Sequence, residues 1–240
     1  LVGGDGAVHH GFCDVALLRT LPGAAIMAAI DEPSLLAAME FMRLYDEGLS
    51  SVRYPRDMVS AALADVACPP FELGKARLLI GPGDGAEVDV AVLAFGTTAI
   101  TALDSARVLA AEYRIAIYDA RFAKPVDRTL IRTLIESRTP IVTVEDHSIV
   151  GGFGSAVIDA AQEMGLDTSR IVRLGLPDSW VYQDSRSAQL AEVGLDAHGI
   201  TRAIRQAATL RPTTLPPPAL APLPVGSIVD PTPVPAPQGR

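Results

Sequence analysis

Hydrophobic residues along this chain form short apolar runs that alternate with stretches in which apolar residues recur at helical spacing. The short runs predict buried β-strands, and they lie at 24–30, 50–54, 74–80, 90–95, 114–119, 140–145 and 171–174. The stretches with helical spacing predict α-helices at 33–45, 99–113, 127–137, 155–164, 189–195 and 200–210. Because strand and helix alternate after position 89, we expect an α/β fold with a mainly parallel sheet flanked by helices.

Capping residues indicate where three of these helices begin. Asp31 precedes Pro33, which fits an N-cap followed by a first-turn proline. Asp127 is the predicted cap of its helix, and a hydroxyl of the turn 96–98 is expected to cap the helix that begins at 99. Gly48 is expected to end the helix that begins near Pro33.

Composition changes at two places and predicts the domain organisation. An alanine-rich stretch that ends in two adjacent prolines predicts a linker over 61–72, between a first domain at 1–60 and a second at 73–210. Residues 211–240 are rich in proline and poor in charge, which predicts a disordered tail. The chain opens inside a motif and without methionine, so we expect it to be the carboxyl part of a longer protein.

The stretch from Gly3 to Asp14 is denser in reactive side chains than any other part of the chain. It holds four glycines, the adjacent His9 and His10, and a carboxylate, Asp5, four residues before His9. Glycines favour a loop wrapped around a ligand, and an imidazole near neutral pH can pass a proton or bind a substrate hydroxyl. The stretch therefore predicts catalytic roles for His9 and Asp5, with Asp5 orienting the imidazole and His10 as a secondary candidate. An ordinary surface turn with the same residues remains the alternative.

Two arginines lie at the carboxyl end of the strand predicted at 50–54. Arg56 lies just past its carboxyl end, where open α/β sheets commonly bind ligands. Arg56 is therefore a predicted functional residue, and Arg53 is a secondary candidate. A solvated surface arginine is the alternative.

Charge and cysteine content exclude several classes of protein. A net charge of −8 without a lysine or arginine run argues against a nucleic-acid binder. Two cysteines, Cys13 and Cys68, predict a reducing compartment and no disulfide framework. We find no apolar run of about 18 residues and no signal peptide, so the cytoplasm is expected and no membrane partner. No metal-ligand spacing appears, and the glycines at 151–154 suit close packing better than an anion site.

Six ordered blocks carry a family resemblance. They lie at 5–22, 31–32, 52–56, 121–125, 145–155 and 174–178. These blocks resemble the D-G-x-T-H-x-G, D-E, V-R-Y-P-R-G, R-F-x-K-P-L-D, G-G-x-G-S and G-L-P-D motifs of 1-deoxy-D-xylulose-5-phosphate synthases, thiamine-diphosphate enzymes of the transketolase superfamily. Val8 stands where that family usually has threonine, and Asp57 stands where it has glycine after R-Y-P-R.

The resemblance implies a function and a place for the cofactor. Residues 1–60 would be the end of a thiamine pyrimidine-binding domain, and 73–210 a transketolase C-terminal-like domain. Enzymes similar to this chain join pyruvate to glyceraldehyde 3-phosphate, with release of CO2, in isoprenoid precursor synthesis. His9 and Asp5 would contact substrate hydroxyls, and Arg56 would bind the phosphate. Thiamine diphosphate and Mg2+ would be held mostly upstream, in a full-length homodimer, so the isolated chain is expected to be inactive.

Two other interpretations remain open. The chain resembles, less closely, part of a transketolase or of the β subunit of a 2-oxoacid dehydrogenase, which share the carboxyl-terminal fold. It could also be a non-catalytic interaction domain, in which Val8 and Asp57 would mark lost activity.

Overall fold

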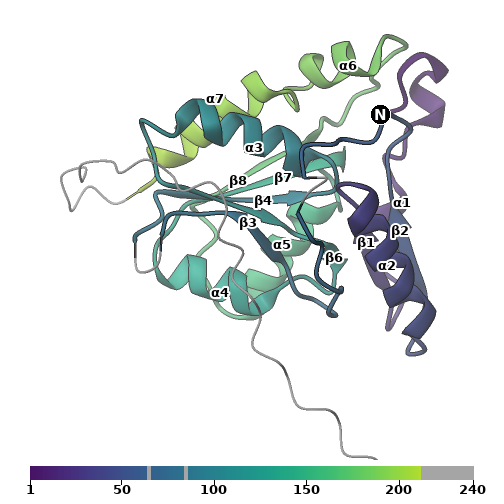
Figure 1. Cartoon of the computed structure of the whole chain (residues 1–240), viewed down its shortest axis with the longest axis horizontal. Coiled ribbons are helices and arrows are strands. Elements are labelled where there is room, and N and C mark those ends of the chain that lie inside the picture. The colour runs from purple at the N-terminus through teal and green to yellow at the C-terminus, as the bar shows by residue number, and fades with distance from the viewer. Residues whose placement is uncertain (64–65, 84–85, 212–240) are drawn as a thin grey trace, which may run out of the picture.

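A computed structural model describes residues 1–63, 66–83 and 86–211 (Figure 1). The predicted Pro-rich tail lies outside the described residues after position 211, and the predicted linker at 61–72 lies partly outside them. Within the described part, two β-sheets stand beside each other, and helices cover their faces (Figure 1).

The larger sheet has five strands and confirms the predicted α/β class. Its order is β3 (Arg77–Ile80), β5 (Ile115–Asp119), β4 (Val90–Phe95), β7 (Ile141–Ser148) and β8 (Ile171–Leu176). The strands run parallel except for β3, which pairs antiparallel with β5 at one edge. Central β4 is apolar throughout and buried at every position, as expected for a parallel strand covered on both faces.

Helices cover both faces of this sheet. The alternation of side chains along β4 divides the core: Val90 and Val92 pack towards α3 (Thr98–Leu109) and α7 (Ala197–Ala208), whereas Leu93 faces the other way. The second face is covered by α4 (Arg128–Glu136) and α5 (Phe153–Glu163) (Figure 1). The helices predicted for these four segments are all present, with ends shifted by a few residues.

The smaller sheet has three strands in the order β2 (Ser50–Arg53), β1 (Ala25–Ala28) and β6 (Phe122–Lys124). Helix α2 (Glu32–Leu44) packs on it, and Met27 and Phe122 lie in the shared core. The sequence did not predict β6, whose antiparallel pairing with β1 joins segments nearly a hundred positions apart. Through β6, a segment of the predicted second domain completes the sheet of the predicted first one.

Helix caps follow the prediction at two of three sites. The Asp31 carboxylate accepts from the Ser34 N–H, and the Ser34 hydroxyl accepts from the Asp31 N–H, which forms a capping box. Asp127 caps α4 through the Leu130 N–H. The hydroxyl cap predicted for the turn 96–98 was wrong, because Thr98 Oγ1 donates instead to the carbonyls of Phe95, at the end of β4, and of Val144, within β7. Helix α2 also ends at Leu44, before Gly48.

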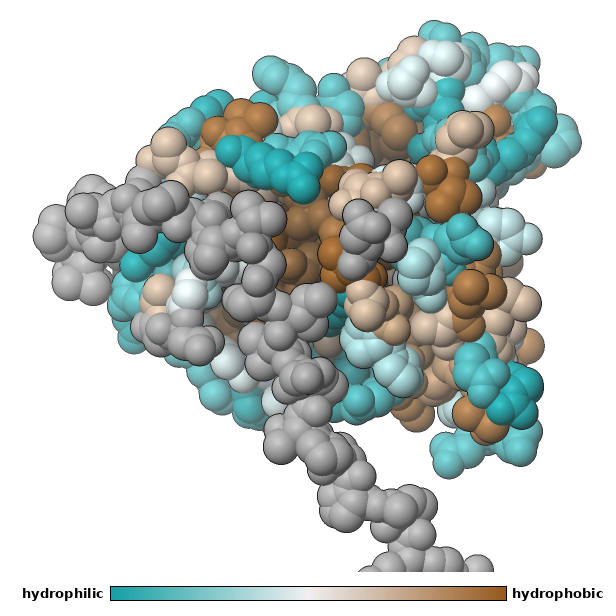
Figure 2. Space-filling model, in the orientation of Figure 1, coloured by the Kyte–Doolittle hydropathy of each residue, from teal (hydrophilic) through white to brown (hydrophobic). Residues whose placement is uncertain are grey.

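One face of α2 remains exposed although it is apolar. The side chains of Leu36, Met39 and Leu44 are all more than half exposed. Figure 2 shows apolar residues lying among polar ones on this side of the molecule.

Two short helices differ from the prediction. Helix α1 (Asp14–Leu18), which follows the glycine-rich loop, was not predicted, and α6 (Arg186–Glu192) begins three residues before the predicted start at 189.

Candidate functional site

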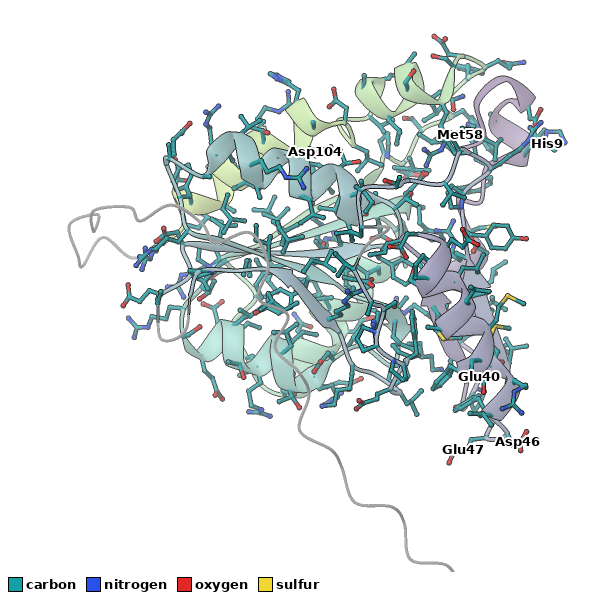
Figure 3. All side chains as sticks on the ribbon, in the orientation of Figure 1. His9, Glu40, Asp46, Glu47, Met58 and Asp104 are labelled. Carbon is teal, nitrogen blue, oxygen red and sulfur yellow. The ribbon has the colours of Figure 1, made fainter. Side chains whose placement is uncertain are left out.

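The glycine-rich loop ahead of α1 folds into two consecutive 3-10 turns. They span Gly3–Asp5 and Ala7–His9, and Gly6 between them takes a φ of 83°, which a side chain would disfavour. The Nδ1 of His9 lies 3.0 Å from the backbone carbonyl oxygen of Asp5. His9 is exposed and points away from the body of the molecule (Figure 3). The loop therefore presents the imidazole to solvent, with its position set by backbone contacts.

The Asp5 carboxylate has a different partner from the predicted one. It forms an ion pair with the Arg56 guanidinium, while only the Asp5 carbonyl contacts His9. Arg56 remains 66% exposed in this pair, so its remaining donors face solvent. Asp5 thus brings together two residues, His9 and Arg56, that lie 47 positions apart in the sequence. Their predicted roles in substrate binding stay predictions.

A cavity of about 510 Å³ lies beside this group, at the junction of the two sheets. Its walls come from the carboxyl ends of β1, β2 and β4 and from the residue Asp146 of β7. In open α/β sheets this edge is the usual place for ligands. Arg53 and Arg56 both line the cavity, and His9 lies outside its walls.

Arg53 joins three segments of the chain around this cavity. Its Nε donates to Asp14 Oδ2 at 2.6 Å, and its Nη2 donates to the Gly11 carbonyl at 2.7 Å. A third, longer bond of 3.3 Å reaches the Asp146 carbonyl in β7. These contacts fix the end of β2 to the reactive loop, and they use donors that a substrate would otherwise take.

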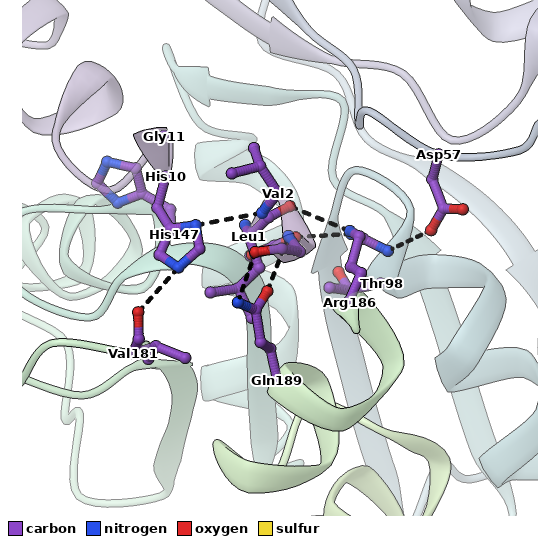
Figure 4. Close-up of polar contacts among 12 residues, drawn as sticks. Leu1, Val2, His10, Gly11, Asp57, Thr98, His147, Val181, Arg186 and Gln189 are labelled. Atoms are coloured by element: carbon purple, nitrogen blue, oxygen red, sulfur yellow. Dashed lines mark hydrogen bonds and ion pairs between the residues drawn. The ribbon is translucent and has the colours of Figure 1, made fainter. Parts of the chain in front are cut away.

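His10, the secondary candidate, points into the interior. Its Nδ1 accepts from the Val2 N–H at 3.2 Å, so the Nε2 carries the proton and donates to the Val181 carbonyl at 3.1 Å (Figure 4). Burial lowers the pKa of His10, which favours this neutral form. Both nitrogens are occupied, and the side chain ties the loop to the segment after β8.

The glycines before α5 enclose an internal anion. The Glu145 carboxylate accepts from the N–H groups of Phe153 and Gly154 at 2.6 and 2.8 Å. A Cβ at Gly152 would collide with Glu145, which explains the glycine by close packing. Burial raises the pKa of Glu145 to about 7, although the two N–H groups act in the opposite direction. Those donors are therefore taken by the chain itself.

His147 lies between this carboxylate and the cavity. Its ring is buried, its Nδ1 lies 2.9 Å from the Ser148 carbonyl, and its Nε2 lies 3.7 Å from Asp14 Oδ1. Burial, together with the nearby Arg53 guanidinium, lowers the pKa of His147 to about 4. The imidazole is thus neutral at pH 7.

Sequence reasoning missed the residues that hold these loops from the other end of the chain. Arg186 of α6 forms ion pairs with Asp57 at 2.8 Å and with Asp146 at 2.7 Å. Gln189, one turn further along α6, is buried and bonds both backbone groups of Gly3 (Figure 4). Asp57 was singled out only as a departure from the family pattern, and no local pattern marks its partner more than 120 positions later.

Two features of the described residues bear on the binding of thiamine diphosphate and magnesium. In the ranges 1–63, 66–83 and 86–211, no group of three or more His, Cys, Asp or Glu side chains could hold a metal ion. The N–H groups at the start of α5, which could bind a diphosphate, already bind Glu145. None of the helices described has the length and hydrophobicity that a membrane crossing requires.

Comparison with known proteins gives one family. Residues 83–200 match the model of the transketolase C-terminal domain. The chain is 40% identical over 210 residues to 1-deoxy-D-xylulose-5-phosphate synthase 1 of Geobacter metallireducens, and 41% identical over 204 residues to the corresponding synthase of Thermus thermophilus. Each match includes 85% of this chain and 32% or 31% of the relative, so the chain spans about a third of the length of these relatives.

Two solved structures are similar in fold. A protein described as a split gene transketolase, an inactive beta4 tetramer, superposes with a TM-score of 0.72 at 28% identity. The match covers 88% of this chain and 65% of that one. A transketolase from Leishmania mexicana superposes with a TM-score of 0.64 at 17% identity, over 92% of this chain and 30% of that one, which shows the shared fold.

Proposed function

Because the chain belongs to the 1-deoxy-D-xylulose-5-phosphate synthase family and carries a transketolase C-terminal domain, we propose that it is part of a thiamine-diphosphate-dependent synthase. The reaction condenses pyruvate with glyceraldehyde 3-phosphate to 1-deoxy-D-xylulose 5-phosphate and CO2. We assign 1–60 to the end of the pyrimidine-binding domain, 61–72 to the linker and 73–210 to the C-terminal domain. The full-length protein works as a cytoplasmic homodimer in this proposal.

The observation that carries the proposal is the group formed by Asp5, His9 and Arg56. Asp5 contacts both other residues, and Arg56 lines the cavity with its side chain 66% exposed. A guanidinium binds phosphate oxygens through two parallel N–H bonds, so Arg56 exchanges its exposed pair with Asp5 for the phosphate of the aldehyde. Release of the Asp5 carboxylate leaves it free to accept from a substrate hydroxyl. His9, exposed beside it, donates to or accepts from a second hydroxyl.

The cofactor is assigned to residues outside this chain. Thiamine diphosphate supplies the carbon–carbon bond-forming chemistry when it is bound. This assignment is supported by two observations: no group of three or more His, Cys, Asp or Glu side chains in the described ranges could hold a metal ion, and the N–H groups at the start of α5 bind Glu145. The chain's own part is to bind and orient the phosphorylated aldehyde, and the chain alone forms no product.

Titration of the 240-residue chain with glyceraldehyde 3-phosphate tests the phosphate assignment. We expect Arg56→Gln to weaken binding at least tenfold, since it removes a charged bidentate donor, for which charge-assisted bonds are worth about 1.5–3 kcal/mol. Arg43→Gln is the matched control, because Arg43 is equally exposed on α2 and pairs only with Glu40 in the next turn. Equal affinities for wild type and Arg56→Gln would refute the assignment. Formation of 1-deoxy-D-xylulose 5-phosphate by the chain alone, with cofactor and magnesium added, would refute its inactivity.

A second candidate is a subunit of a split enzyme that is completed by a separate chain. Its support is the similarity, over 88% of this chain, to a split gene transketolase whose tetramer is described as inactive. The exposed apolar side chains of Leu36, Met39 and Leu44 on α2 are compatible with contact to another polypeptide. Activity that appears only when a separate cofactor-binding chain is mixed with this one would favour the split arrangement.

A further inference from the structure

The candidate loop rests on a segment that lies near the other end of the chain. Residues 183–189, which comprise the turn before α6 and the first turn of that helix, form the α6 platform. Gln189 is fully buried, its Oε1 accepts from the Gly3 N–H at 2.9 Å, and its Nε2 donates to the Gly3 carbonyl at 3.0 Å. A side-chain amide that occupies both backbone groups of one residue fixes the position and direction of the chain there.

Two glycines of the loop lie very close to the α6 platform. Gly3 has a φ of 72°, and a Cβ there would lie 3.4 Å from the Arg186 backbone nitrogen. A Cβ at Gly6 would lie 2.9 Å from the Gln183 side chain. Two of the loop's glycines therefore face the platform itself, and Asp5 lies between them.

The same platform also holds the loop that carries Arg56. Arg186 Nη1 lies 2.8 Å from Asp57 Oδ2, and its Nη2 lies 2.7 Å from Asp146 Oδ2 on the cavity wall. Its Nε donates to the Leu1 carbonyl at 3.2 Å (Figure 4). The Arg186 side chain is 15% exposed and that of Asp57 is 44% exposed, so this ion pair is partly open to solvent.

Asp57 makes this pairing matter for an anionic ligand. The residue is adjacent to Arg56 in sequence, and its free carboxylate would oppose a phosphate at that arginine. While Arg186 pairs with Asp57, the guanidinium offsets part of that negative charge and directs the carboxylate towards α6, although it also pairs with Asp146. The chain therefore keeps a carboxylate next to its predicted phosphate residue with reduced repulsion.

We propose that the α6 platform aligns the two halves of the candidate site, with Gln189 and Arg186 as positioning residues. Gln189 seats the loop that bears Asp5 and His9, and Arg186 orients the loop that bears Arg56 and neutralises Asp57. The inference rests on the proposed function for the identity of the ligand. The seating of the loop is a property of the chain alone.

A double-mutant cycle on glyceraldehyde 3-phosphate binding tests the neutralising role. Arg186→Gln frees the Asp57 carboxylate and also removes one partner of Asp146, and we expect about fivefold weaker binding. Asp57→Asn alone is expected to bind within about twofold of wild type or more tightly. The double variant is expected to bind more tightly than Arg186→Gln, because it lacks the Asp57 charge, and the affinity it fails to recover measures the contribution of Asp146. A purely structural role for Arg186 predicts instead that the double variant binds as weakly as Arg186→Gln. That result would overturn the neutralising role, as would unchanged binding by Arg186→Gln. Glu192→Gln, an exposed change on the same helix, is the control.

A measurement without ligand keeps the platform testable if the wild-type chain does not bind the aldehyde, which would refute the proposed phosphate site separately. Amide hydrogen exchange at Gly3 reports the bond to Gln189. In Gln189→Leu we expect exchange at Gly3 to accelerate about tenfold, while exchange at Val92 in the central strand keeps its wild-type rate. The single tryptophan gives a second signal, because the Trp180 ring packs edge-on against Phe12 of the loop at 5.4 Å, and its emission should shift. Unchanged exchange at Gly3 would overturn the seating role.

Discussion

Two groups of arginines and carboxylates lie on either side of the junction between the sheets, and they differ mainly in burial. Beneath the predicted linker, Asp119 and Arg121 are almost completely buried, and Arg121 donates to the carbonyls of Pro69 and Pro70. Beside the cavity, Asp5 and Arg56 form a pair that stays about half exposed. The first group stabilises contacts within the chain, whereas the second leaves N–H donors of Arg56 accessible to a ligand.

Desolvation explains the difference. In the buried group, burial raises the pKa of Asp119 to about 6, and the charge of Arg121 acts against that shift. Arg77, also buried, donates to the Ala67 carbonyl, and its charge lowers the pKa of Asp119 in the same direction as that of Arg121. Charges taken out of water need partners to stay stable, whereas water solvates the exposed pair whether it is made or broken. A ligand can therefore replace Asp5 as the partner of Arg56 at small cost.

The largest effect is expected from Asp119→Asn. The change leaves the buried guanidinium groups of Arg77 and Arg121 without a counter-charge, and loss of one partner of a buried ion pair typically costs about 3–5 kcal/mol. Urea unfolding at pH 7.5, above the pKa of the carboxyl, measures the free energy of unfolding. Asp104→Asn is the control, because Asp104 is exposed on α3 and pairs with Arg107 in the next turn (Figure 3). If both variants lost less than about 1 kcal/mol, the buried group would not hold the linker.

A smaller effect on the free energy of unfolding is expected from the protonation of His147 as the pH falls. Its pKa in the folded chain is about 4, below the 6.5 of the unfolded chain, so the unfolded chain binds more protons between these values. His147 therefore does not reduce the free energy of unfolding above pH 6.5. As the pH falls from 6.5 towards 4, this group lowers the free energy of unfolding by about 3 kcal/mol at most. Glu145, with a pKa raised to about 7, acts with the opposite sign, because its contribution is lost as the pH rises from 4.5 through 7.

The variant His147→Gln separates the two contributions. We expect its stability to fall less than that of wild type between pH 7 and pH 4.5, measured by urea unfolding at several pH values. His198→Gln, on the surface of α7, should follow the wild-type curve. Parallel curves for wild type and His147→Gln would show that His147 titrates alike in the folded and unfolded chains.

The sequence predicts a region well when its contacts are local in the chain, and poorly when they join distant segments. Strand β4 was predicted residue for residue, because Val90–Phe95 is an apolar run whose burial on both faces can be read locally. Strand β6 was missed, since three residues give no period and its partner β1 lies far away in the chain. The glycines at 151–154 were correctly assigned to packing, but their partner Glu145 could only be identified in three dimensions.

The candidate site shows the same limit. The sequence placed Asp5, His9 and Arg56 in one predicted site, and their contacts through Asp5 bring them together. It did not predict that the Asp5 carboxylate would turn to Arg56, because side-chain pairing depends on rotamers rather than on spacing. Gln189 was also missed, since a glutamine in a helix carries no local sign that it binds the backbone of Gly3.

The smallest effect on stability is expected from Arg56→Gln. The pair between Arg56 and Asp5 is 66% and 43% exposed, and exposed pairs contribute between zero and about 1 kcal/mol because water and salt screen them. We expect the free energy of unfolding in urea to change by less than about 0.5 kcal/mol, while the affinity for glyceraldehyde 3-phosphate falls at least tenfold. The two measurements on one variant distinguish a binding residue from a structural one. A loss of stability close to that of Asp119→Asn would place Arg56 with the buried arginines, and would remove the distinction between the two groups.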